Sequence, residues 1–162
     1  MDENTKISRL LGQLDDLCPS GYAIALHIRY TTPTFLFQTY PKDWMEYYSQ
    51  NGLVLHDPTV RWGLTNTGTR YWHALRDDDA MGVFEKAEKF GMRYGFVRAL
   101  MNGKSRTVAS FARGDRDYSD DEVAQISEIL DLLDRKTADP EALPADERAE
   151  LKRLSINLTH GA

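Results

Sequence analysis

The chain is poor in cysteine and in long hydrophobic runs, and both shortages narrow what it can be. Cys18 is its only cysteine, so no internal disulfide can form. No apolar stretch approaches the roughly 20 residues that a membrane-spanning helix needs. The first thirty residues also lack the basic start, apolar run and small-residue cleavage site of a signal peptide. We therefore expect a cytoplasmic protein that does not associate with a membrane.

An excess of positive charge is also missing. The 162 residues include 20 basic and 25 acidic side chains, which gives a formal net charge of -5. Broad electrostatic capture of nucleic acid or anionic lipid is therefore excluded, and any nucleic-acid role would need a local basic patch. A chain of this length with 41% hydrophobic residues can bury one full core but hardly two. We expect one domain with an appendage.

Residue sets that carry catalysis or bind metals are absent from the sequence. The four histidines are scattered and form no close-spaced set with cysteine or carboxylates, as zinc would require; they are His27, His56, His73 and His160. There is no glycine-rich phosphate loop and no G-x-S-x-G elbow, and Cys18 has no identifiable base. We therefore expect no metal, no cofactor and no catalytic residues, and an enzyme that degrades a small molecule has no nucleophile to act with.

Hydrophobic periodicity predicts an α+β domain. Three-to-four-residue spacing predicts a helix over 7–17, and alternation predicts strands over 22–30 and 34–39. Further helices are expected from Pro41, over 59–64 behind an Asp57 cap, over 81–90, and from a capping box at Ser119. Residues 65–69 have the composition of a loop.

The clearest local signal is a hairpin around Asn102-Gly103, which joins predicted strands over 92–101 and 104–113. In this register one sheet face carries Gly95, Val97, Ala99, Arg106, Val108, Ser110 and Ala112. Residues 137–144 contain two prolines and acidic side chains, so they indicate a linker, and a short charged helix is expected from 145 to about 154.

Amphipathic aromatic side chains gather around the carboxylate of Asp57. They are Tyr40, Trp44, Tyr47, Tyr48, Trp62, Tyr71 and Trp72. Trp44 and Tyr48 are four residues apart and share one helical face, with Tyr40 just before it. Such a set can line an apolar pocket while keeping a few hydrogen-bonding tips. The alternative is a set of ordinary core aromatics with Asp57 only as a helix cap, and composition leaves both open.

The ordered spacing of these residues resembles the autoinducer-binding domain of LuxR-type quorum-sensing regulators. The resemblance covers about 7–133, and its matching string is Tyr40-Pro41, Trp44, Tyr48, Asp57-Pro58, Val60, Trp72, Phe90-Gly91 and Tyr94-Gly95. The resemblance implies an αβα sandwich, in which an antiparallel sheet of about five strands lies between helical layers. It also implies that an acyl-homoserine-lactone-like signal is enclosed between the sheet and one layer.

By the same resemblance, polar side chains would hold the ligand's head group. The Trp44 indole would donate to the lactone carbonyl, Tyr40 would donate to the acyl carbonyl, and Asp57 would accept from the amide N–H. Tyr48 and Trp72 would pack against the amide and lactone, with Thr59 and Ser110 as further polar contacts. The acyl-chain tunnel would be lined by Leu36, Val60, Val97 and Val108.

Two stretches depart from the family's pattern. Arg98 stands where an apolar strand is usual, and we expect it to face solvent or a carboxylate; the alternative is a charged ligand or partner. Residues 143–151 resemble the opening helix of the family's helix-turn-helix domain, but no recognition helix follows. We therefore expect a sensing domain over 1–136 and a linker with a first-helix remnant over 137–162.

The expected partners follow from this division. They are a small-molecule signal and either a second copy of the chain or a full-length LuxR-type regulator, without direct DNA binding by this chain alone. The alternative is a truncated, ligand-independent interaction protein that forms inactive heterodimers with full-length regulators.

Overall fold

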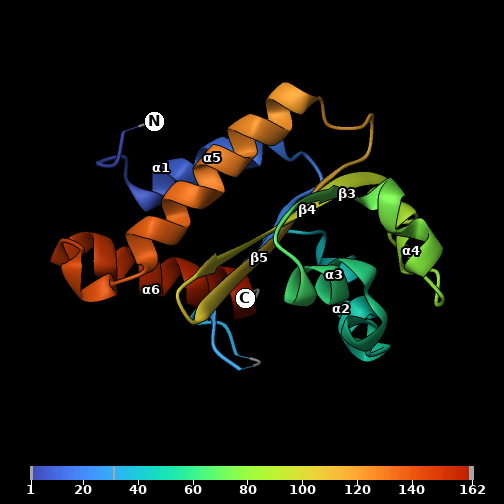
Figure 1. Ribbon diagram of the computed structural model, residues 1–162, viewed down its shortest axis with the longest axis horizontal. Helices are drawn as coiled ribbons and strands as arrows, with labels where there is room; N and C mark the ends of the chain where they lie inside the picture. Colours follow the sequence, from blue (N-terminus) through green and yellow to red (C-terminus); the bar gives the residue numbers. More distant parts are fainter. Residues whose placement is uncertain (1, 31, 161–162) are drawn as a thin grey trace.

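Five antiparallel strands form one sheet with helices on both faces (Figure 1). The computed structural model describes residues 2–30 and 32–160, with side chains up to residue 155. The strand order is β2-β1-β5-β4-β3. The strands are β1 (Tyr22–Ile28), β2 (Phe35–Gln38), β3 (Gly68–Tyr71), β4 (Tyr94–Asn102) and β5 (Ser105–Arg113). This architecture confirms the predicted α+β sandwich.

The first helical layer consists of α1 (Ile7–Leu17) and α5 (Asp120–Thr137). The predicted periodicity of α1 is confirmed, because Ile7, Leu10 and Leu14 are buried against the core. At the start of α5 the predicted capping box is present, with Ser119 and Glu122 each bonding the other's backbone N–H. The apolar stripes of both helices pack on the sheet face that carries Phe96 and Phe111.

The second helical layer covers the opposite face of the sheet (Figure 1). It contains α2 (Lys42–Gln50), α3 (Pro58–Thr65) and α4 (Val83–Glu88), with 3-10 turns η1 (Leu53–His56) and η2 (Trp72–Asp78) between them. Asp57 caps α3 by accepting a hydrogen bond from the backbone N–H of Thr59, as predicted. A separate apolar cluster fills this interface and includes Trp44, Trp72, Phe84 and Val97.

The β4–β5 hairpin keeps the predicted faces although its turn lies one residue later. Asn102 pairs with Ser105, so Gly103 and Lys104 form the turn, and Gly103 takes a left-handed φ of 62°. The pairing moves by an even number of residues, so no side chain changes face. Ser110 therefore lies opposite Val97 on the face below the second layer.

Two predicted boundaries were wrong for physical reasons. Residues 68–71 form the edge strand β3, although a loop is predicted over 65–69, because pairing with β4 supplies the hydrogen bonds of the strand. The helix expected over 81–90 spans only Val83–Glu88. Gly82 has a left-handed φ of 65°, and the Asp79 carboxylate accepts the backbone N–H bonds of Val83 and Phe84.

Arg98 meets a carboxylate, as expected. Its guanidinium donates to both carboxylate oxygens of Asp131 on α5, at 2.9 and 2.8 Å, and to the Thr69 hydroxyl at 3.1 Å. This places Arg98 on the α5 side of the sheet, away from the face that carries Val97. The arginine therefore joins strand to helix and takes no part in the second layer.

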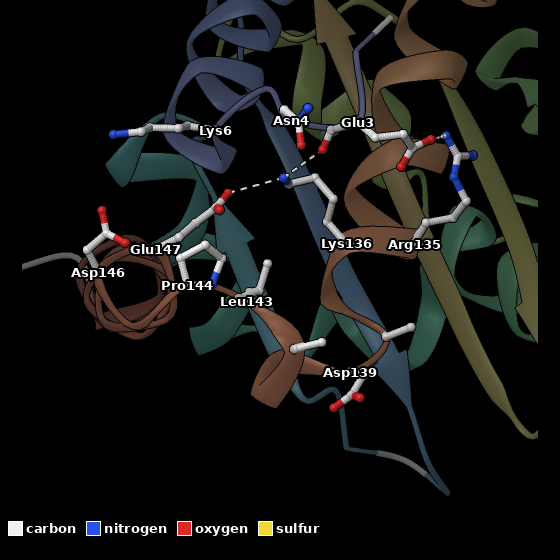
Figure 2. Close-up of a pocket in the computed structure, with 12 residues that line it drawn as sticks. Glu3, Asn4, Lys6, Arg135, Lys136, Asp139, Leu143, Pro144, Asp146 and Glu147 are labelled. Carbon is white, nitrogen blue, oxygen red and sulfur yellow. Dashed lines mark hydrogen bonds and ion pairs between the residues drawn. The ribbon is translucent and has the colours of Figure 1, made fainter.

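The C-terminal segment folds back onto the first layer. After a 3-10 turn at Pro140–Ala142, α6 (Ala145–His160) lies beside β2 and α1, and Leu151 is buried in their shared core. The Glu147 carboxylate accepts from the Ile7 backbone N–H at 3.2 Å and pairs with Lys136 Nζ at 3.3 Å (Figure 2). Ser155 bonds the backbone of Leu36 on β2. The helix expected to end near 154 is therefore longer and packs on the domain.

Candidate functional site

Ser110 on β5 is the point where two predicted site side chains meet. The Tyr40 hydroxyl donates to the Ser110 carbonyl oxygen at 3.0 Å, and the Trp72 indole N–H donates to the Ser110 hydroxyl oxygen at 2.8 Å. Ser110 and Trp72 are both buried, and Tyr40 is partly buried. These bonds hold the segment before α2 and the start of η2 against the centre of the sheet.

Asp57 is the second polar centre of the site. One carboxylate oxygen accepts from the Thr59 backbone N–H at 2.9 Å and from the Thr59 hydroxyl at 2.7 Å. The other accepts from the Tyr48 hydroxyl at 2.8 Å. Burial raises the pKa of Asp57, and the hydrogen bonds from Thr59 and Tyr48 oppose that rise. Asp57 is thus both a helix cap and the partner of an aromatic tip on α2.

The two tyrosines are hydrogen-bond donors in this arrangement. Burial raises the pKa of Tyr40, and burial together with the nearby Asp57 charge raises the pKa of Tyr48. Both phenols therefore keep their protons at neutral pH. Each can donate one hydrogen bond, either to its present acceptor or to a ligand oxygen in its place.

Trp44 packs at the centre of an aromatic group on the second layer. Its ring centroid lies 5.6 Å from that of Tyr48, 5.4 Å from Phe90 and 6.1 Å from Tyr47. Trp44 is 4% exposed. Trp62 has a buried indole N–H without a hydrogen-bond partner among the described residues. This layer therefore contains one buried indole donor that is not bonded to the described residues.

The predicted apolar residues divide into two groups. Val97 is buried and lies opposite Ser110, and the half-buried Val108 packs against the same cluster. Val60 stands on α3, three residues after Asp57, and is half-buried. Leu36 is on edge strand β2, where Ala25 of β1 separates it from Val108. Leu36 is therefore the predicted residue farthest from the hydrogen-bonded centre.

Gly95 is a residue of this site that sequence patterns did not single out for function. A Cβ at this position would overlap the Trp72 indole and would lie 2.5 Å from the Phe111 carbonyl oxygen. Only a residue without a side chain lets the indole lie flat on β4 and reach Ser110. A glycine inside a strand, on the face predicted to carry the site, is the signal that could have indicated this close approach.

Two cavities of the molecule do not reach Asp57 or Trp44. One of about 490 Å³ is lined by residues of the N-terminal segment, the end of α5 and the start of α6 (Figure 2). Another of about 350 Å³ borders the outer side of Trp72 and is lined by His73, Arg76 and Arg93 among others. The polar groups of the site bond to one another, through Tyr48 with Asp57 and through Trp72 with Ser110.

The described part of the chain shows neither a cluster of metal ligands nor a membrane-spanning helix. No three histidine, cysteine, aspartate or glutamate side chains gather there as metal ligands; the predicted non-ligand His160 lies outside the described side chains. No helix among the described residues has the length and apolar character to cross a bilayer.

Comparisons with known proteins agree with this fold. Residues 19–136 match the family model described as autoinducer binding domain. The transcriptional activator SolR of Ralstonia nicotianae is 32% identical over 95 residues, which are 58% of this chain and 40% of SolR. VanR of Vibrio anguillarum is 29% identical over 68 residues, which are 41% of this chain and 28% of VanR. The chain thus spans less than half the length of these relatives.

Solved structures show the same fold at lower identity. SdiA in complex with octanoyl-rac-glycerol superposes with a TM-score of 0.58 at 19% identity, covering 95% of this chain and 76% of SdiA. CepR2 of Burkholderia cenocepacia, an N-acylhomoserine lactone dependent factor, gives 0.58 at 19% identity over 80% of this chain and 79% of CepR2. The chain belongs to the family of autoinducer-binding domains of LuxR-type quorum-sensing regulators.

Proposed function

We propose that the chain binds an acyl-homoserine-lactone-like signal between the sheet and the second helical layer, and that binding regulates transcription through dimerisation. The observation that carries this proposal is the partly buried Asp57 carboxylate, which accepts hydrogen bonds from Thr59 and from Tyr48, whose ring packs against Trp44. A partly buried carboxylate near an indole donor suits a ligand that offers both an N–H and a carbonyl.

Each polar side chain takes one part of the head group in this proposal. The Trp44 indole N–H donates to the lactone carbonyl. Asp57 accepts from the ligand's amide N–H, and the Tyr40 hydroxyl exchanges the Ser110 carbonyl for the acyl carbonyl. A hydrogen bond to a charged group contributes about 1.5–3 kcal/mol, and each buried methylene adds about 0.8 kcal/mol.

The relatives support a ligand with an acyl chain. CepR2 is described as dependent on N-acylhomoserine lactone, and SdiA was solved with octanoyl-rac-glycerol, so both names join an acyl group to a polar head. We further propose that residues 1–136 are the sensing domain and residues 137–162 a linker with the first helix of a DNA-binding domain. The partner in the dimer would be a second copy or a full-length regulator, and this chain alone would not contact DNA.

The second candidate is a ligand-independent interaction protein that forms inactive heterodimers. The observation that favours it is the mutual bonding of Tyr48 with Asp57 and of Trp72 with Ser110, which satisfies these groups without a ligand. Such a protein would melt at the same temperature whether or not a lactone is present.

A thermal-shift experiment separates the two functions. We expect a saturating N-acyl-homoserine lactone to raise the melting temperature by several degrees, because a ligand that binds only the folded state stabilises it. Asp57→Asn should remove most of that rise, since the amide N–H of the ligand loses its charged acceptor. Asp43→Asn, on the exposed side of α2, is the matched control and should leave the rise unchanged.

The proposal fails if no lactone with a chain of four to twelve carbons shifts the melting temperature of the wild-type chain. An equal rise in melting temperature in Asp57→Asn and in wild type would show that Asp57 does not bind the lactone.

A further inference from the structure

α3 is seated directly on β5 at Gly63. A Cβ on Gly63 would overlap the Val108 side chain, so glycine lets the helix backbone touch the sheet at this point. Gly63 is buried, and Val108 packs into the same apolar cluster as Val97. No alkyl chain fits between helix and strand where these two residues meet.

Arg106 on β5 stabilises this contact through hydrogen bonds to α3. It lies on β5 two residues from Val108, and its guanidinium donates to the carbonyl oxygens of Gly63, at 2.9 Å, and of Asn66. Both carbonyls are at the C-terminal end of α3, where a cation is favoured by the helix dipole. The end of α3 is therefore held on the sheet by a contact and by two hydrogen bonds.

The Gly63–Val108 contact is close to the proposed head-group residues along both elements. Gly63 lies six residues beyond Asp57, about 9 Å along a helix. Val108 lies two residues from Ser110, about 7 Å along a strand. An acyl chain that starts at Asp57 and Ser110 and runs between α3 and β5 would therefore meet this contact after about 7–9 Å.

We propose that the Gly63–Val108 contact sets the ligand specificity of this chain, which takes short acyl groups of up to about six carbons. An extended chain advances about 1.2 Å per bond, so six carbons span the distance from the head-group residues to the Gly63–Val108 contact. The inference rests on the proposed function and names the ligand class of the same site. Val108 and Gly63 are specificity residues at the apolar end, while the head-group residues determine whether a lactone binds at all.

Calorimetric titration with N-butanoyl-, hexanoyl-, octanoyl- and dodecanoyl-homoserine lactone tests the proposal. We expect the affinity to rise from four to six carbons and to fall at least tenfold by twelve. Val108→Ala removes the side chain that meets Gly63, so it should raise the dodecanoyl affinity at least fivefold relative to the hexanoyl affinity. Arg106→Met removes the two hydrogen bonds to the end of α3, so it should also raise the dodecanoyl affinity relative to the hexanoyl affinity.

Val123→Ala is the matched control, because Val123 packs in the cluster on the other face of the sheet. It should leave the chain-length profile unchanged. Dodecanoyl binding as tight as hexanoyl binding in wild type would overturn the proposal while leaving the sensor function standing. Unchanged ratios in both Val108→Ala and Arg106→Met would also overturn it. Absence of binding by all four lactones would instead reject the proposed function, and the specificity with it.

Discussion

Gly95→Ala is expected to lower the free energy of unfolding by about 2–3 kcal/mol, because overpacking a well-packed core costs this much. The added methyl would overlap the Trp72 indole and approach the Phe111 carbonyl oxygen, and a backbone atom in a central strand has little room to move. Trp72 would have to leave Ser110, which breaks their 2.8 Å hydrogen bond. Urea denaturation followed by tryptophan fluorescence measures both the loss of stability and the displaced indole.

Gly12→Ala provides the matched control for this substitution. Gly12 lies within α1, and a Cβ there would meet no atom within 4 Å. Alanine is favoured over glycine inside a helix by about 0.8–1 kcal/mol, so this variant should be more stable than wild type. If Gly95→Ala were as stable as wild type and had its fluorescence, the close seating of Trp72 on β4 would be wrong.

Asp134→Ala is expected to lower the free energy of unfolding by about 3 kcal/mol, because it removes the acceptor at the centre of a buried polar group. The Thr107 hydroxyl donates to the Asp134 carboxylate at 2.6 Å, and His27 Nε2 lies 3.8 Å from it. The His27 ring also bonds the Ser105 and Thr137 hydroxyls, at 3.1 and 2.9 Å. The group joins β1, β5 and α5 in the interior.

Asp131→Ala tests whether burial is the cause of that loss. Asp131 lies on the same helix and pairs with Arg98, but its side chain is 34% exposed. Partly exposed ion pairs contribute about 0–1 kcal/mol, so its loss should be the smaller one. Urea denaturation of both variants makes the comparison, and equal losses would show that the buried group contributes no more than a surface pair.

The regular elements were predictable where local physics determines them. The leucine stripe of 7–17 and the Ser119 cap each need only residues within one or two helical turns, and both were confirmed. β3 was not predictable, because its strand conformation depends on pairing with a segment that comes later in the chain. A helix was predicted from residue 145, but its charged composition did not indicate that it docks through Glu147, Leu151 and Ser155, which share one stripe.

The contacts of the candidate site also divide into those that local sequence predicts and those that depend on the tertiary fold. Tyr48 and Asp57 are nine residues apart, and their hydrogen bond follows from adjacent helices whose caps and spacing the sequence displays. Trp72 and Ser110 are 38 residues apart, so only the family resemblance could suggest that they lie in one site. Gly63 and Arg106 gain their roles from packing between layers, which no pattern within a single element records.

The most direct test of the sensor account is mass spectrometry of the small molecules that the protein retains. The full chain would be expressed beside a strain that produces mixed acyl-homoserine lactones, purified, and extracted with organic solvent. The account predicts a lactone close to one per folded protein from wild type, and little or none from Asp57→Asn purified in parallel. Wild-type protein that is folded and carries no lactone would contradict it.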